Sequence, residues 1–72
     1  MKLFILKTDI KSKRQLNRLK PIFQQNEHIF RWSIDLDDID KVLKVETNED
    51  SKQNEMIQLV RDQGIYCEEL PD

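Results

Sequence analysis

The side chains that could bind a metal ion through sulfur or imidazole nitrogen are few and scattered. They are Met1, His28, Met56 and the single cysteine, Cys67. No two of them lie at a spacing that metal sites use, such as two cysteines separated by two residues. We therefore expect a loop position for His28, a core position for Met56, and a packed position on a strand for Cys67.

Four aspartates, Asp35, Asp37, Asp38 and Asp40, resemble a calcium-binding loop in composition alone. Such a loop needs a glycine at its sharp turn and a glutamate at its end, and this segment has neither. The aspartates therefore indicate a solvated turn. Catalysis has no better candidates, because the chain has one histidine and one glycine. It contains no glycine-rich phosphate-binding loop and no recognisable pair of nucleophile and base, so we predict that it is not an enzyme.

The best candidate for a binding surface is a cation cluster formed by Lys11, Lys13, Arg14 and Arg18. Basic residues concentrate in the first 20 positions, whereas the whole chain has a net charge of −2. Positive charge near a helix N-terminus opposes the helix macrodipole by a few tenths of a kcal/mol per charge. We therefore expect this cluster to contact a protein partner with an acidic surface; the alternative is a set of solvated side chains without a specific role.

Hydrophobic periodicity predicts a strand, a helix, two strands, a helix and a strand. The expected elements are a strand at 2–8, a helix from Lys13 to Asn26, strands at 29–36 and 41–47, a helix between a capping cluster at 48–51 and a C′ residue at Gly64, and a strand that starts at Ile65 and stops before Pro71. Two right-handed crossovers give an α+β, ferredoxin-like βαββαβ sandwich with a four-stranded antiparallel sheet and two helices on one face. We expect residues 1–72 to form a single domain.

The alternation in 29–36 bears on nucleic-acid binding. It predicts that Phe30, Trp32, Ile34 and Leu36 point toward the core. RNA-recognition domains share this strand order, but they stack bases on aromatic side chains of the open sheet face. With those aromatics turned inward and a negative net charge, we predict no nucleic-acid partner.

Ser12 and Gln15 stand where the first strand leads into the first helix. Serine is a good N-cap, and a glutamine three residues later completes a capping box. Such a serine stabilises a helix by about 1 kcal/mol relative to alanine. We hypothesise that hydrogen bonds of these two side chains hold the loop.

Five segments, taken together in their order and spacing, indicate a family. They are Leu6–Ile10, the helix with Pro21, Trp32–Asp35, Asp40–Thr47 and Gly64–Tyr66. They resemble small bacterial heavy-metal-associated proteins related to copper chaperones. This resemblance implies a Cys-x-x-Cys in the loop before the first helix, where two thiolates hold Cu(I). By position, the two cysteines correspond to Ser12 and Gln15, which cannot supply a thiolate, so we predict no metal or other cofactor.

The sequence therefore predicts a non-catalytic heavy-metal-associated-like domain that has lost its metal-binding cysteines. It would be a protein-interaction or regulatory module linked to metal homeostasis, and it would dock through the cation cluster or self-associate through a sheet face or edge. The alternative is residual copper or zinc binding or transport, through an intermolecular site that uses Cys67 or His28.

The apolar run Leu3–Leu6 is far shorter than the ~20 residues that cross a membrane. A lone cysteine suits a reducing compartment, so we expect a cytoplasmic protein without a membrane partner.

Overall fold

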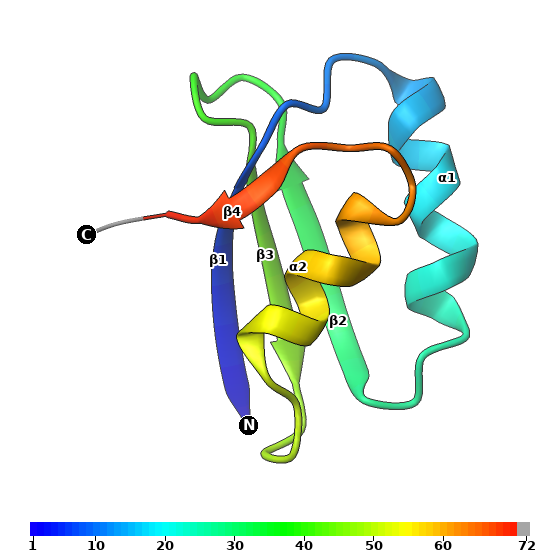
Figure 1. Cartoon of the computed structure of the whole chain (residues 1–72), viewed down its shortest axis with the longest axis vertical. Helices are drawn as coiled ribbons and strands as arrows, with labels where there is room; N and C mark the ends of the chain where they lie inside the picture. The colour runs from blue at the N-terminus through cyan, green and yellow to red at the C-terminus, as the bar shows by residue number, and fades with distance from the viewer. Residues whose placement is uncertain (71–72) are drawn as a thin grey trace.

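A computed structural model describes residues 1–70, and they form the six elements in the predicted order. The elements are β1 (Lys2–Thr8), α1 (Lys13–Gln24), β2 (Ile29–Asp35), β3 (Val42–Thr47), α2 (Gln53–Arg61) and β4 (Cys67–Glu69). The strands make one sheet in the order β2-β3-β1-β4, and every neighbouring pair is antiparallel. Both helices lie on the same face of the sheet (Figure 1). The predicted ferredoxin-like fold is therefore confirmed.

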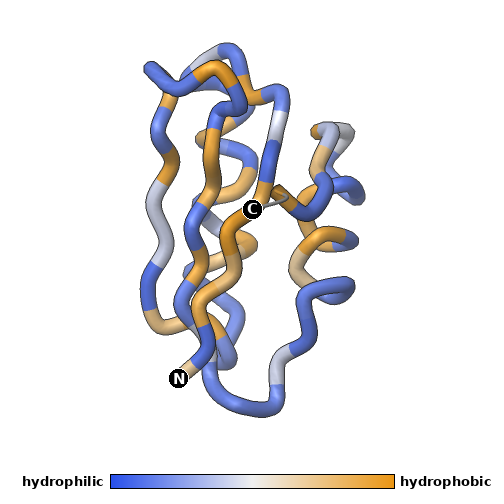
Figure 2. The backbone as a smooth tube through the Cα atoms, turned by 90° about the vertical axis from the view of Figure 1, so that its left-hand side faces the viewer, coloured by the Kyte–Doolittle hydropathy of each residue, from blue (hydrophilic) through white to orange (hydrophobic). Residues whose placement is uncertain are grey.

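The core lies between this sheet face and the two helices. Its fully or almost fully buried side chains are Leu6, Ile10, Leu19, Phe23, Leu43, Val45, Met56, Val60, Ile65 and Cys67. Hydrophobic and hydrophilic residues are interspersed along the strands (Figure 2), and in β3 buried and less buried residues alternate from Leu43 to Thr47. The rings of Phe23 on α1 and Trp32 on β2 meet edge to face, with centroids 5.0 Å apart. This aromatic contact, of a kind that stabilises cores beyond area burial, fastens α1 to the sheet.

The prediction that Phe30 points into the core is wrong. The ladder between β2 and β3 is irregular between Ile29 and Arg31, so Phe30 is the additional residue of a β-bulge. Ile29 takes the place opposite Thr47 that faces the core, together with the half-buried Trp32 and Ile34, and Phe30 is 62% exposed. One additional residue in a strand exchanges the core-facing and outward-facing positions on its N-terminal side. The alternation of hydrophobic residues in the sequence does not show where such a residue lies.

Hydrogen bonds of side chains set several boundaries that differ from the predicted ones. The Asp35 carboxylate accepts from the backbone N–H of Asp37 at 3.1 Å, which ends β2 one residue early. Lys41 has a left-handed φ of 46°, so β3 begins at Val42. The backbone N–H of Tyr66 donates to a side chain instead of a strand, so β4 begins at Cys67 rather than Ile65. Pro71 lies outside the described residues.

The helix ends also differ in detail. In place of an end at Asn26, α1 stops at Gln24, and the N–H of Asn26 donates to Phe23 O at 3.3 Å in a tightened last turn. Before α2, Asn48 Oδ1 accepts from both the N–H and the hydroxyl of Ser51. The predicted capping cluster is thus a turn that precedes the helix, whose N-cap is Lys52. The C-cap of α2 is Asp62, so Gly64 lies one residue beyond the predicted C′ position, although it has a left-handed φ of 77° that suits glycine.

Within residues 1–70, neither helix has the length and apolar character needed to cross a membrane.

Candidate functional site

The loop between β1 and α1 is held firmly although it lies at the surface. The side chain of Ile10 is fully buried and anchors the middle of the loop in the core. Thr8 Oγ1 accepts from the backbone N–H of Ile10 at 3.3 Å and donates to the carbonyl of Lys41 at 2.7 Å. The start of the loop is therefore tied to the end of the β2–β3 connection.

Ser12 and Gln15 form hydrogen bonds across the junction between this loop and α1. Ser12 Oγ accepts from the backbone N–H of Gln15 at 3.4 Å, as the predicted N-cap requires. Gln15 Oε1 accepts from the backbone N–H of Lys11 at 2.6 Å. A capping box would return this bond to Ser12, so the reciprocal bond is displaced by one residue. Each side chain nevertheless satisfies a backbone donor of the loop or of the first helical turn.

Asp9 is a structural residue of this loop that the sequence analysis missed. Its Oδ1 accepts from the backbone N–H of Tyr66 at 3.0 Å, which ties the loop to the segment leading into β4. Its charge could have drawn attention to it, because Asp9 is the only acidic residue among the first 20 positions. Its partner is distant in sequence, so no local motif identifies the contact.

The side chains with soft or imidazole donors do not come together. Cys67 is fully buried in the core, and burial raises the pKa of its thiol to about 11. His28 is exposed, and its Nδ1 accepts from the Asn48 amide at 2.6 Å. Among residues 1–70, no group of three histidine, cysteine or acidic side chains is arranged to hold a metal ion.

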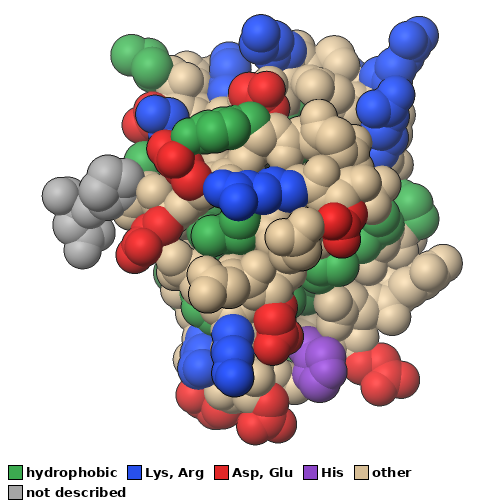
Figure 3. Space-filling model, viewed as in Figure 1, with side chains coloured by type: hydrophobic (Ala, Val, Ile, Leu, Met, Phe, Trp, Pro, Cys, Tyr) green, Lys and Arg blue, Asp and Glu red, His purple; other side chains and the backbone are tan. Residues whose placement is uncertain are grey.

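The four side chains of the cation cluster, Lys11, Lys13, Arg14 and Arg18, are all exposed. Lysine and arginine side chains gather beside the N-terminal half of α1 (Figure 3). The ion pairs of residues 1–70 join the Met1 amino group to Glu49, Lys7 to Asp40, and Arg31 to Glu46. None of them neutralises the cation cluster, and the first turn of α1 contains no acidic residue.

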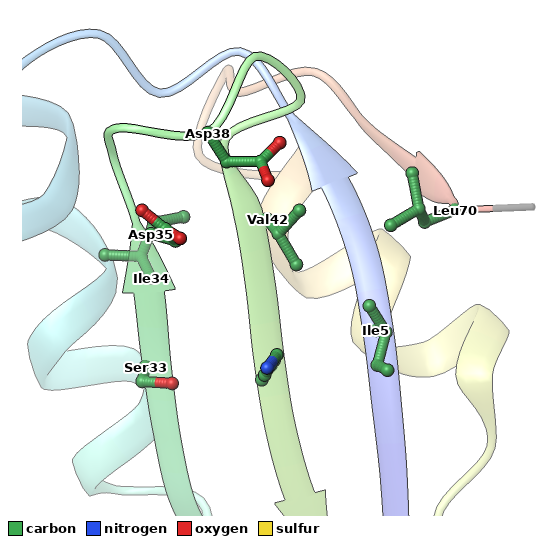
Figure 4. A pocket seen from close by; sticks show the side chains of 8 residues that line it. Ile5, Ser33, Ile34, Asp35, Asp38, Val42 and Leu70 are labelled. Atoms are coloured by element: carbon green, nitrogen blue, oxygen red, sulfur yellow. The ribbon is translucent and has the colours of Figure 1, made fainter.

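A shallow pocket of about 430 Å³ lies on the open face of the sheet, opposite the helices (Figure 4). Ile5, Val42 and Leu70 form its apolar part, and Asp38 reaches over it from the β2–β3 connection. No aromatic side chain lines it, which is the feature that base stacking would need. The pocket contains none of the site residues expected from the sequence.

Comparisons with known proteins place this geometry in a structural context. No protein-family model matches the chain, and no curated protein sequence matches it. Among solved structures, a chain of the Atx1–Cu(I)–Ccc2a complex matches with a TM-score of 0.84 and 16% identity, covering 100% of this chain and 99% of that one. The yeast copper transporter domain Ccc2a, solved in apo and Cu(I)-loaded states, matches over the same shares with a TM-score of 0.82 and 16% identity. The chain therefore has the fold of these copper-handling, heavy-metal-associated domains.

Proposed function

We propose that residues 1–72 are one non-catalytic, heavy-metal-associated-like domain that docks an acidic protein surface and does not use its first loop to bind metal. The observation that carries this proposal is the use of Ser12 and Gln15. By the family resemblance these are the positions of two cysteines, and here both side chains accept hydrogen bonds from the backbone of the loop. Neutral oxygen donors compete poorly for Cu(I), which prefers thiolates.

The charge of the cation cluster supports the docking role. Four exposed cations, which form no ion pair with the acidic residues of the described range 1–70, create a positive potential around the start of α1. Such a field accelerates the encounter with an acidic surface and fixes the orientation of the complex. The cations also oppose the helix macrodipole, which a role in binding would explain. One of the similar structures is itself a protein complex that contains Cu(I). This likeness supports the further proposal of an interaction or regulatory role in metal homeostasis.

Burial argues against residual metal binding through Cys67. A metal-binding cysteine must be deprotonated and accessible, whereas the Cys67 thiol is fully buried and its pKa is raised to about 11. His28 alone would provide one imidazole from each of two molecules, which is half of a tetrahedral zinc site.

A metal titration tests the first half of the proposal. The purified chain is titrated with Cu(I) and with Zn(II) under reducing conditions against a competing chelator. We expect no stoichiometric binding tighter than micromolar. Tighter binding would contradict the proposal, and the variants Cys67→Ser and His28→Ala would then locate the ligands, with circular dichroism to check that each variant folds.

A capture experiment tests the second half. The immobilised chain is compared with Lys13→Glu/Arg14→Glu and with the matched control Lys20→Glu/Lys52→Glu, which changes the net charge equally at exposed positions outside the cluster. We expect a partner retained by the wild type and the control to be lost by the first variant, and to be released by salt. Equal retention by both variants would contradict docking through the cation cluster.

A further inference from the structure

The two edges of the sheet differ in how well they are protected from pairing with another strand. At one edge, β4 has three residues, two of which are glutamates. At the other edge, β2 has seven residues and pairs only with β3 among residues 1–70. Short strands, charges, prolines and lysines are the usual protection of an edge. β2 contains no proline and no lysine, and its bulge lies at one end of the strand. Its two charged residues, Arg31 and Asp35, have opposite signs, so they repel a further strand only in some registers.

The regular part of β2 has a symmetric pattern of side chains. The bulge at Phe30 limits the regular ladder to residues 31–35, and Ser33 is its central residue. On the open face, Arg31 and Asp35 flank Ser33 with opposite charges, and all three are exposed. On the helix side, Trp32 and Ile34 are half-buried. The segment 31–35 therefore has a serine at its centre, an apolar residue on each side of the serine, and opposite charges at its two ends.

We propose that β2 binds a second copy of this chain by antiparallel pairing about a two-fold axis through Ser33. Such an isologous interface needs a surface that is complementary to itself. In this register, Arg31 faces Asp35 of the second copy, and the axis repeats this ion pair. Trp32 faces Ile34 of the second copy, also twice. The product is an eight-stranded sheet with the helices of both copies on one side.

The contacts around Arg31 are compatible with this arrangement. Its side chain is 81% exposed, and its Nε lies 3.6 Å from Glu46 Oε2 on β3. In the dimer, Arg31 lies between Glu46 of its own chain and Asp35 of the second copy, and cross-strand pairs of opposite charge are favourable. The exposed Phe30 lies at the end of the ladder, where Leu36 follows Asp35 in the second copy.

Charge distinguishes this register from the other symmetric ones. Pairing centred on Trp32 or on Ile34 would place Ser33 opposite Arg31 or opposite Asp35, so neither joins the two charges in an ion pair. Pairing centred on Arg31 would place two arginines opposite each other, and pairing centred on Asp35 would do the same with two aspartates. Like charges directly opposite on a sheet are unfavourable. The Ser33-centred register is the symmetric one that pairs both charges and keeps the apolar side chains on the helix side. This interface is separate from the cation cluster, so it does not depend on the proposed docking function.

Sedimentation equilibrium of the full chain at micromolar to millimolar concentrations tests the proposal. We expect the wild type to dimerise reversibly. Arg31→Asp and Asp35→Arg should each raise the dimer dissociation constant at least about tenfold, because the two-fold axis makes each repulsion occur twice. The double variant Arg31→Asp/Asp35→Arg should restore dimerisation. Lys52→Asp, an equal charge change at an exposed position away from β2, should behave as wild type.

Circular dichroism at each concentration keeps a failure to fold apart from a failure to associate. A wild type that remains monomeric at millimolar concentration would overturn the proposal. So would single variants that dimerise as well as the wild type. If the folded double variant is as monomeric as the single ones, the register about Ser33 is wrong.

Discussion

Gln15 reaches back from the first turn of α1 to accept a hydrogen bond from the backbone N–H of Lys11 at 2.6 Å. This bond closes the loop onto the helix that follows it, while Ser12 caps the same helix from the other direction. Ser12 and Gln15, which the family resemblance aligns with two cysteines, thus have a structural task in this chain. Their role can therefore be tested by measurements of stability as well as by metal titrations.

Removing the Gln15 side chain should destabilise the fold. Gln15→Ala leaves the N–H of Lys11 without its partner, and we expect the free energy of unfolding to fall by about 1 kcal/mol. Ser12→Ala should cost a similar amount through the lost N-cap. Asn17→Ala, an exposed position on the same helix, is the matched control and should change stability by less than about 0.5 kcal/mol. Urea unfolding monitored by circular dichroism measures all three; a Gln15→Ala variant as stable as the control would show that the bond contributes nothing.

Introducing cysteines at positions 12 and 15 should create a metal-binding site. The double variant Ser12→Cys/Gln15→Cys places two thiols at the N-terminus of α1, beside Lys11, Lys13 and Arg14. A helix N-terminus and nearby cations lower the pKa of a thiol, so thiolates form readily there. We expect the double variant to bind one Cu(I) per chain in competition with a chelator, and Ser12→Cys alone to bind far more weakly. No binding by the folded double variant would mean that these positions do not correspond to the cysteines of the family.

Reversing the charge of the cation cluster should increase stability. The first turn of α1 contains no acidic residue, and Lys13 and Arg14 place two positive charges against the macrodipole. Lys13→Glu/Arg14→Glu should raise the free energy of unfolding by about 1 kcal/mol at low salt. High salt should reduce this gain through screening. Lys20→Glu, in the middle of α1, should show little of it. A destabilised double variant would mean that the cluster supports the fold and is not held there for binding.

The sequence predicts the fold well because each strand and helix buries a stripe of its own period. The prediction fails at Phe30 because a β-bulge depends on how two strands pair. Ile29 pairs with Thr47 and Arg31 with Glu46, which leaves Phe30 as the additional residue. The sequence predicts the N-cap of Ser12 because that hydrogen bond is local. The capping box predicts that the Gln15 side chain accepts from the N–H of Ser12, whereas it accepts from the N–H of Lys11.

The contact of Asp9 with the Tyr66 backbone joins residues far apart in sequence. Such a contact is set by the assembled sheet, and no local pattern encodes it. Docking through the cation cluster would involve a partner outside the chain, so this role stays a prediction.

Cys67 should make the fold sensitive to alkaline pH. Burial raises the pKa of its thiol to about 11 in the folded chain, from an ordinary value of 9.0 that the unfolded chain keeps. Between these values the unfolded chain has lost the proton and the folded chain retains it. The stability present below the unfolded pKa is therefore lost as the pH rises toward about 11.

The comparison with Cys67→Ala isolates this contribution. The pKa of Tyr66 is raised as well, chiefly by a hydrogen bond with Glu68 that is common to both proteins; the charge of Cys67 is the smallest of the causes. We expect the wild type to lose about 2 kcal/mol more than the variant between pH 8 and about 11, measured by urea unfolding under reducing conditions. Equal losses would show that the thiol ionises as easily in the folded chain as in the unfolded one. The same burial predicts that Cys67 reacts with a thiol-specific disulfide reagent only when urea opens the core, because attack requires an accessible thiolate.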